Sequence, residues 1–494
     1  MIDLKKYEFY FIVGSQDLYG EQVLRTVDEH SKKMVASLDA RLPCKLVWKP
    51  VVLDSDGILK VIREANANPN CAGIVTWMHT FSPSKMWIAG LTELKRPLCH
   101  FHTQFNRDIP LDSIDMDFMN LNQSAHGDRE HGFIGARLRL PRKIVVGYWE
   151  DPKVVDKLSG WMRAAAAFAE GKRLKVARFG DNMREVAVTE GDKVETQIKL
   201  GWSVNGYGVG DLVEYVNKIT EAEIDKLVKT YGEEYEVAAD AKTGEGAKRV
   251  REQARMELGI KKFLEAGDFG AYTDTFQDLH GLPQLPGLAS QRLMAAGYGF
   301  GAEGDWKTAC LVRMMKVMAS GLGGVSFLED YTYNLDPAAP VDLSAHMLEV
   351  CPSIAKGKPR LEVHPLGIGG KADPARLVFS GESGPAVNVT LVDMGGRMRL
   401  IVNETDTIDP KPMPKLPVAR VMLKPRPSLE LAAECWIIAG GAHHTSYSRV
   451  VKTEWLRDWA EIAGIEFILI GEKTDPEELR KEIRWNEAAY RLGL

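Results

Sequence analysis

The stretch YEFYFIVGSQDLYGEQVLRTVDEHSKKMVASL, residues 7–38, decides the fold class of the first part of the chain. Residues 7–13 form an apolar run typical of a buried strand. Gly14-Ser15-Gln16 then predict a turn, and residues 20–38 have the periodicity of a helix. A strand that leads through a turn into a helix is the unit from which parallel α/β sheets are built.

The same alternation continues to about residue 171. Further apolar runs lie at residues 45–53, 72–77, 97–101 and 143–149, and helical patterns lie at 55–65, 83–93 and 151–171. Strands that alternate with helices at this spacing predict right-handed β-α-β units and a parallel sheet. We therefore expect a Rossmann-like α/β domain over residues 1–172.

Two further regions follow, and they differ in their pattern of predicted strands and helices. A second parallel α/β domain is predicted over residues 173–324, with a strand at 175–179, helices at 209–218, 288–296 and 306–319, and a charged helical stretch at 221–264. After residue 321 short strands predominate, as at 360–364, 376–380, 387–392 and 398–402, with a hairpin turn at 393–396. Helices return at 455–463 and 476–492. This pattern predicts a β-rich third domain over residues 325–494.

The composition excludes several classes of protein. The 494 residues are 45% hydrophobic and 27% charged, with a net charge of −5 and mixed signs throughout, so a nucleic-acid partner is not expected. The sequence shows neither a signal-peptide pattern nor an apolar run long enough to span a membrane. The six scattered cysteines form no C-x-x-C pair and are expected to be reduced. We expect a cytoplasmic protein.

Four segments place ionisable side chains among glycines or at element ends, where sites are common. They are Gly299–Trp306 with Glu303 and Asp305, Ser326–Tyr331 with Glu329 and Asp330, Ser344–Met347 with His346, and Gly440–Thr445 with His443 and His444, which follows an expected strand at 435–439. Each also has a structural explanation, such as charge in the first turn of a helix or a hydrogen-bonded core histidine. Residue type alone does not choose between these explanations.

Two carboxylates and two imidazoles, if they converge, form a mixed oxygen and nitrogen ligand set. Such a set suits Mn²⁺, Co²⁺, Ni²⁺ or Fe²⁺ better than a structural zinc, which more often has thiolate ligands. Four protein ligands leave about two positions of an octahedral ion open for neighbouring oxygens of a small molecule. The spacing of these residues cannot show that they converge.

Two other patterns, a glycine run and a lone histidine, also suggest ligand binding. Gly299–Gly304 reads G-x-G-x-x-G, but a helical pattern precedes it where a dinucleotide fingerprint requires a strand, and the chain has no P-loop. His79 follows the strand expected at 72–77 and could line a ligand crevice or be a buried hydrogen-bonded residue. Both readings of His79 remain open.

The chain resembles the L-arabinose isomerase family nearly from end to end. The motifs that carry this resemblance are VGSQDLYG at 13–20, WMHTFSPSKMW at 77–87, MNLNQSAHG at 119–127, GFGAEGDW at 299–306, FLEDYTY at 327–333 and GGAHHT at 440–445.

The resemblance implies interconversion of L-arabinose and L-ribulose, with D-galactose to D-tagatose as a side activity. It places the metal, Mn²⁺ or a substitute such as Co²⁺, on Glu303, Glu329, His346 and His444, with the two glutamates as the acid/base pair. The substrate-binding residues it implies are Gln16, Leu18, His126, Met183, Phe276 and Ile368, with His126 supplied by a neighbouring subunit. It further implies a barrel-like third domain and a homohexamer with shared active sites.

The hypothesis for the chemistry is that Glu303 and Glu329 move protons through a cis-enediol, with the metal polarising the carbonyl. A hydride shift would use the same residues, and the sequence does not separate the two. The alternatives from other classes are a nicotinamide-dependent oxidoreductase built on the Gly299–Gly304 run and a non-catalytic sugar-binding protein.

Overall fold

The structure is a computed structural model that describes residues 2–493. By compactness the chain divides into two units. The N-terminal unit contains Asp3–Ala169 together with Glu454–Ile462, and the larger unit contains Ile2, Glu170–Thr453 and the rest of the C-terminal tail. The larger unit holds both the second parallel sheet and the β-rich region, and the predicted domain boundaries at 172 and 324 stay predictions.

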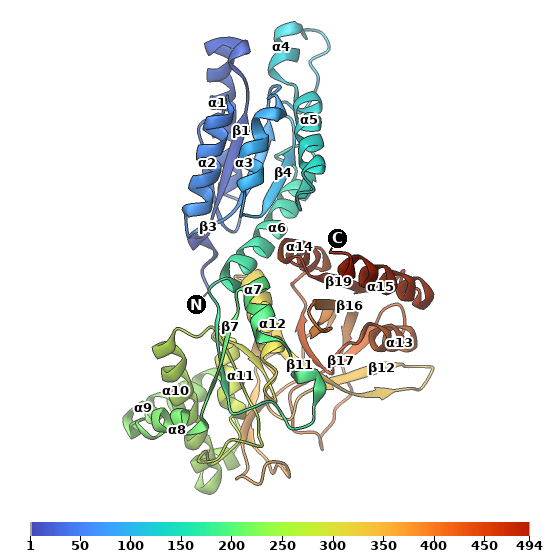
Figure 1. The fold of residues 1–494 in the computed structure, drawn as a ribbon. Coiled ribbons are helices and arrows are strands. Elements are labelled where there is room, and N and C mark those ends of the chain that lie inside the picture. Colours follow the sequence, from blue (N-terminus) through green and yellow to red (C-terminus); the bar gives the residue numbers. More distant parts are fainter. Residues whose placement is uncertain (1, 494) are drawn as a thin grey trace. The chain divides into compact units, whose positions relative to one another are not determined.

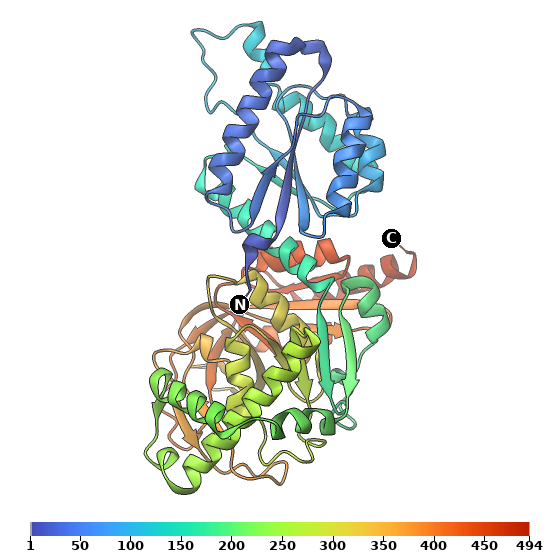
Figure 2. The ribbon, with the colours of Figure 1, turned by 90° about the vertical axis from the view of Figure 1, so that its left-hand side faces the viewer.

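The N-terminal unit is built on a five-stranded parallel sheet in the order β2-β1-β3-β4-β5 (Figures 1 and 2). The strands are β1 (Glu8–Gly14), β2 (Lys45–Trp48), β3 (Cys71–Met78), β4 (Leu98–His102) and β5 (Lys143–Val146). The helices are α1 (Gly20–Asp39), α2 (Ser55–Ala67), α3 (Ile88–Glu93), α4 (Met116–Leu121), α5 (Ser124–Arg137) and α6 (Pro152–Gly171). The parallel α/β prediction is therefore confirmed.

Alternation along β1 explains why helices cover both faces of this sheet. Tyr10 and Ile12 point to one face and share a core with apolar residues of α2, α3 and α5. Phe9 points to the other face, where its ring meets Trp161 of α6 at 5.4 Å between centroids. A strand buried on both faces reads as a continuous apolar run, which is why residues 7–13 identify the fold class.

The second sheet, in the larger unit, is also parallel and has the order β10-β9-β6-β7. Its strands are β6 (Lys175–Phe179), β7 (Ser203–Tyr207), β9 (Ala271–Asp274) and β10 (Gly299–Gly301). Its helices are α7 (Lys193–Leu200), α8 (Val209–Asn217), α9 (Glu221–Glu234), α10 (Gly244–Gly267), α11 (Gly287–Ala295) and α12 (Trp306–Met318). The charged stretch at 221–264, expected to be helical throughout, is interrupted between α9 and α10, where β8 (Glu236–Val237) pairs with β13 (Arg360–Val363).

Six strands of the β-rich region close into a barrel. The order β15-β18-β11-β12-β17-β16 returns to β15, and every pairing around this ring is antiparallel. These strands are β11 (Val325–Asn334), β12 (Val341–Ala345), β15 (Gly384–Asp393), β16 (Met398–Ile408), β17 (Arg420–Pro425) and β18 (His444–Ser448). Outside the ring, β19 (Glu466–Ile470) pairs with β16 in parallel, and β14 (Ala375–Val378) pairs with β13. The predicted hairpin turn at 393–396 joins β15 to β16.

The segment at 435–439 was predicted to be a strand, and this prediction is wrong. It is the last part of helix α13 (Leu429–Ala439), which Gly440 ends in a left-handed conformation. A short apolar run has no periodicity that separates a strand from a helix. The C-terminal helices are α14 (Thr453–Ala463) and α15 (Pro476–Arg491).

Helix α12 joins the second sheet to the barrel within the larger unit, and of its thirteen residues all but Arg313 are buried. Glycines of β10 allow its close approach, since a Cβ at Gly299 would lie 2.1 Å from the Ala309 carbonyl oxygen. The first two glycines of the G-x-G-x-x-G run, Gly299 and Gly301, therefore allow a strand to pack against a helix. The six cysteines are free and buried, and no helix among the described residues is long and apolar enough to cross a membrane.

Candidate metal centre

Barrel pairing brings three of the candidate residues to one end of the barrel. Glu329 on β11 pairs directly with His444, the first residue of β18. On its other side Glu329 pairs with Ala345, the residue that precedes His346. Directly paired residues of an antiparallel sheet have Cβ atoms about 5 Å apart, so this register places the His444 imidazole beside the Glu329 carboxylate. His346 follows directly after the end of β12, next to the residue that pairs with Glu329.

Glu303 reaches the same place from the loop between β10 and α12. Its backbone is left-handed, with φ of 61°, and Gly304 follows with φ of 79°. A Cβ at Gly304 would lie 2.5 Å from the Asn182 Cα atom, so only glycine fits there. The Glu303 carbonyl accepts a hydrogen bond from the Met183 N–H at 2.9 Å, which fixes the strained turn. Strain of this kind, held by its surroundings, is typical of functional loops.

The side chains then converge. His444 Nε2 lies 3.6 Å from Glu303 Oε2, and His346 Nε2 lies 3.6 Å from Glu329 Oε2. Possible ligand atoms of Glu329, His346 and His444 all lie within 4.8 Å of one another. These separations are too long for hydrogen bonds, whereas atoms bound to one ion at about 2.1 Å lie roughly 3–4 Å apart. We call the four residues Glu303, Glu329, His346 and His444 the barrel centre.

Each imidazole of the barrel centre has a carboxylate next to its Nδ1 atom. His444 Nδ1 lies 3.1 Å from Asp305 Oδ2, and His346 Nδ1 lies 2.5 Å from Glu349 Oε2. A carboxylate on Nδ1 fixes the tautomer that leaves Nε2 as the free lone pair, as in many metal-bound histidines. His444 Nε2 is buried and has no hydrogen-bond partner among residues 2–493. This orphaned nitrogen, aimed at Glu303, fits a metal ligand.

The sequence left Glu303 and Asp305 as alternatives, and the structure separates them. Asp305 is buried and caps α12, with its carboxylate accepting from the Thr308 N–H at 3.2 Å and the Thr308 hydroxyl at 2.7 Å. Although burial disfavours its charge, Lys307 and His444 hold the pKa of Asp305 well below its usual range. Asp305 therefore supports His444, while Glu303 faces the cavity.

The other two adjacent pairs also separate. Asp330 follows Glu329 but binds on the opposite side, accepting from the Ser344 hydroxyl at 2.7 Å and the Asn388 amide at 3.0 Å. His443 is half-buried, and its possible ligand atoms lie within 4.8 Å of those of Glu303 and His444. It therefore lies next to the barrel centre, on the side of Glu303 and His444.

Burial sets the charge state of two carboxyl groups beside the centre. Desolvation raises the pKa of Glu303, although His444 and His346 partly offset this effect. Desolvation and the neighbouring Glu349 raise the pKa of Asp274 to about 7. A carboxyl group whose pKa lies nearer to neutrality is better suited to exchange protons than an ordinary surface carboxylate.

A cavity of about 180 Å³ opens beside the centre. Among the residues that line it are three members of the barrel centre (Glu303, Glu329 and His346), Asp274, and three of the predicted substrate-binding residues, Met183, Phe276 and Ile368. The cavity therefore combines apolar walls with a few convergent polar groups, as small-molecule sites do.

The other predicted substrate-binding residues are elsewhere in the chain. Gln16, Leu18 and His126 belong to the N-terminal unit and do not line this cavity. Leu18 is 83% exposed. The His126 ring stacks on Phe81 at 4.5 Å between centroids.

Of the two interpretations of His79, the structure fits the buried, hydrogen-bonded residue. Its ring is fully buried and stacks on Trp77 at 4.6 Å between centroids. Its Nε2 lies 2.8 Å from His30 Nδ1. The structure thus favours a structural role for His79.

Sequence reasoning missed Glu349 and Asp274 as parts of the site, and it named Asp305 without its supporting role toward His444. Glu349 follows His346 by three residues, a spacing that could have suggested the contact. Asp274 ends a buried strand of a parallel sheet, which is a common position for ligand-binding residues. Nothing in the sequence links Asp305 to His444 across the fold.

Two parallel α/β sheets, a closed barrel and a histidine–carboxylate cluster beside a cavity define a multidomain protein with an enzyme-like centre that is compatible with a divalent metal. Family profiles match the chain in three parts: the L-arabinose isomerase N-terminal domain at residues 3–173, the central domain at 175–321 and the C-terminal domain at 324–466.

Full-length relatives agree with these matches. L-arabinose isomerases from Geobacillus stearothermophilus and Geobacillus kaustophilus are 62% and 61% identical to this chain, over 99% of it and 100% of each relative. The L-arabinose isomerase of Thermotoga maritima is 58% identical over 100% of this chain and 99% of its own length. The chain belongs to the L-arabinose isomerase family.

Proposed function

We propose that the protein interconverts L-arabinose and L-ribulose, and converts D-galactose to D-tagatose as a side reaction, with Mn²⁺ or a substitute such as Co²⁺ bound at the barrel centre. The observation that carries this proposal is the paired support of His346 and His444, whose Nδ1 atoms meet Glu349 and Asp305 while their Nε2 atoms face the two glutamates. Membership of the isomerase family supplies the reaction class.

The metal, when bound, supplies a Lewis acid that polarises the sugar carbonyl and orients its neighbouring oxygens. The two glutamates of the barrel centre, Glu303 and Glu329, come from separate structural elements, a loop and a barrel strand. Glu303 and Glu329 then flank the reacting carbons, one removing a proton at C2 and the other handling the proton between O1 and O2. Removal of the C2 proton and protonation of O1 give a cis-enediol, and delivery of a proton to C1 with loss of the proton from O2 then gives the ketose.

Apolar cavity walls position the sugar in this proposal. Met183, Phe276 and Ile368 restrict the space available next to the glutamates and keep bulk water away from them. We further propose that Gln16, Leu18 and His126 complete the pocket in a homohexamer, with His126 supplied by a neighbouring subunit. The exposure of Leu18 supports this part, because the side chain is available for a contact outside its own unit.

The free state of all six cysteines supports a reducing compartment such as the cytoplasm, where we place the protein.

The test is L-ribulose formation from L-arabinose by protein stripped of metal with a chelator and then freed of the chelator. We expect almost no ketose without metal and recovery on addition of Mn²⁺. Glu329→Gln is expected to be inactive with Mn²⁺, while Glu362→Gln, which alters a carboxylate paired with His364 away from the cavity, keeps the activity. Full turnover by stripped protein, or by Glu329→Gln, would overturn the proposal.

A solvent-exchange measurement separates the two chemical routes. A cis-enediol predicts that deuterium from D₂O enters the product at the carbon that gains the proton, whereas a hydride shift predicts none. Product without deuterium would contradict the role given to the two glutamates as proton carriers.

A further inference from the structure

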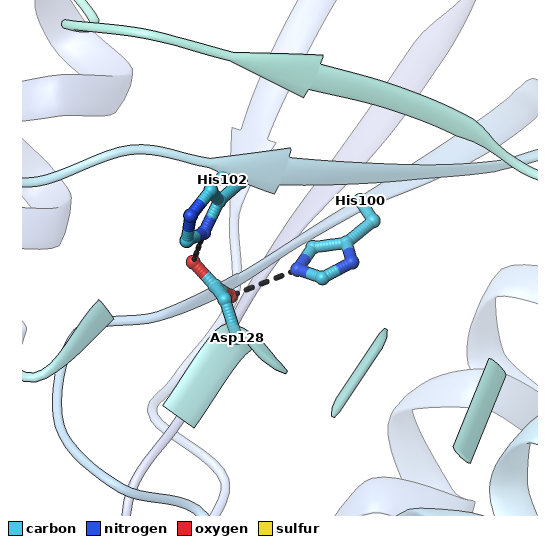
Figure 3. A group of neighbouring side chains, drawn as sticks. All are labelled: His100, His102 and Asp128. Atoms are coloured by element: carbon cyan, nitrogen blue, oxygen red, sulfur yellow. Dashed lines mark hydrogen bonds and ion pairs between the residues drawn. The ribbon is translucent and has the colours of Figure 1, made fainter. Parts of the chain in front are cut away.

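A second histidine–carboxylate cluster lies in the N-terminal unit and contains no residue of the barrel centre. His100 and His102 lie on β4, two residues apart, so their side chains leave the same face of the sheet. Asp128 comes from α5 and lies between the two rings (Figure 3). We call His100, His102 and Asp128 the β4–α5 cluster.

The three side chains meet at short distances. Asp128 Oδ1 lies 3.0 Å from His100 Nε2, and Asp128 Oδ2 lies 2.9 Å from His102 Nδ1. Oδ1 also accepts a hydrogen bond from the Met78 N–H at 3.0 Å. Both carboxylate oxygens are therefore engaged, and this backbone contact fixes the orientation of the carboxylate.

Burial makes this arrangement costly unless its charge is compensated. The Asp128 side chain is fully buried, and that of His100 is 5% exposed. His102 is 29% exposed and forms the open side of the cluster. A buried carboxylate requires a partner of positive charge or strong hydrogen bonds, because it loses its hydration.

The contact between His100 and Asp128 has the distance of a hydrogen bond without its direction. Despite the separation of 3.0 Å, His100 Nε2 has no hydrogen-bond partner among the described residues. Two atoms that bind one ion point at the ion and not at each other, and they lie roughly 3–4 Å apart. The misaligned pair is thus better explained by an ion beside the N···O line than by a shared proton.

We propose that the β4–α5 cluster is a second divalent metal site, which takes a borderline transition-metal ion such as Zn²⁺. Two imidazoles and one carboxylate suit such an ion better than Mg²⁺ or Ca²⁺, which prefer oxygen ligands. Water entering beside His102 supplies the remaining ligand. The three ligand atoms lie within 4.8 Å of one another, and tetrahedral zinc requires about 3.4 Å, so a small rotation of the rings closes the site.

The bound ion would join β4 to α5. Asp128 is the ligand contributed by α5, and both imidazoles come from β4, so the ion bridges a strand and a helix that are adjacent in this unit. The site shares no residue with the barrel centre or with the predicted substrate-binding residues.

The experiment measures zinc bound per chain after equilibrium dialysis of chelator-stripped, full-length protein against buffered Zn²⁺. We expect two ions per wild-type chain. His102→Gln, at the exposed and therefore tolerant position, is expected to bind one ion and to keep its isomerase activity with Mn²⁺. A His346→Gln/His444→Gln double variant is expected to bind one ion, and adding His102→Gln to it leaves none.

His364→Gln is the matched control, because His364 also pairs with a carboxylate, Glu362 at 2.6 Å, but belongs to no three-residue ligand group among residues 2–493. It should keep two ions. With Co²⁺ as the probe, the His346→Gln/His444→Gln double variant should show visible d–d absorption. This absorption should disappear when His102→Gln is added to the double variant. A single ion in wild type that is lost in the double variant, or an unchanged count in His102→Gln, would overturn the second site whether or not the protein is an isomerase.

Discussion

The barrel centre and the β4–α5 cluster use the same two kinds of side chain in different arrangements. In the barrel centre each imidazole has one carboxylate behind it on Nδ1 and another about 3.6 Å in front of Nε2. In the β4–α5 cluster a single carboxylate lies between two imidazoles and meets both directly. The comparison indicates that supporting carboxylates, more than the number of histidines, distinguish a centre prepared for chemistry from one suited to holding an ion.

The largest effect is expected from Glu303→Gln. Glutamine keeps the size of the side chain but cannot exchange protons as a carboxylate does, so the rate should fall about 100-fold or more. The measurement is kcat for L-ribulose formation at saturating Mn²⁺. Asp330→Asn alters the carboxylate that faces away from the cavity, and it should leave kcat within a few-fold of wild type. Equal losses in the two variants would contradict the assignment of Glu303.

A smaller effect should separate the adjacent histidines. His444→Gln removes the buried Nε2 that faces Glu303, so Mn²⁺-dependent activity should fall strongly, though by less than in Glu303→Gln. His443→Gln alters a half-buried ring next to the centre and should reduce activity only modestly. Activity titrated against Mn²⁺ concentration measures both. The reverse ranking would assign the ligand to His443.

Asp305→Asn tests the supporting carboxylate itself. Asparagine still caps a helix well, so α12 should be retained. The negative charge of the carboxylate that faces His444 Nδ1 is lost in this variant. Loss of such a partner weakens metal affinity by about 10–100-fold. The Mn²⁺ concentration for half-maximal activity should rise accordingly. Asp192→Asn changes the cap of α7, which contacts no histidine of the centre, and should not shift it. An unshifted Mn²⁺ requirement in Asp305→Asn would contradict the supporting role of Asp305.

The sequence predicts the parallel sheets well, because buried strands and amphipathic helices differ in periodicity. Sequence patterns and the family resemblance also identify the four residues of the barrel centre. They do not predict the strand register that brings these residues together, because Glu329 and His444 pair only once the barrel closes. The supporting role of Asp305 depends on the same closure. Likewise, His100 and Asp128 belong to different elements, and no local pattern connects them. Long-range pairing is the part that local physics does not encode.

The smallest effect is expected from Asp128→Asn in metal-free protein. Loss of the charged contacts to His100 and His102 should lower the opening free energy of α5 by about 1–3 kcal/mol. Native-state hydrogen exchange of α5 amides measures this change. Asp115→Asn, which changes the cap of the neighbouring helix α4, is the control. Unchanged α5 exchange in Asp128→Asn would indicate that the contacts contribute nothing without metal.

Glu303, Glu329, His346 and His444 are proposed to bind one ion together. Anomalous diffraction from crystals grown with Mn²⁺ tests this directly. We predict a manganese peak bound by both glutamates and by the Nε2 atoms of both histidines, with Asp305 and Glu349 on the Nδ1 atoms. A peak at His443 in place of His444, or no peak beside the cavity in active crystals, would contradict this assignment.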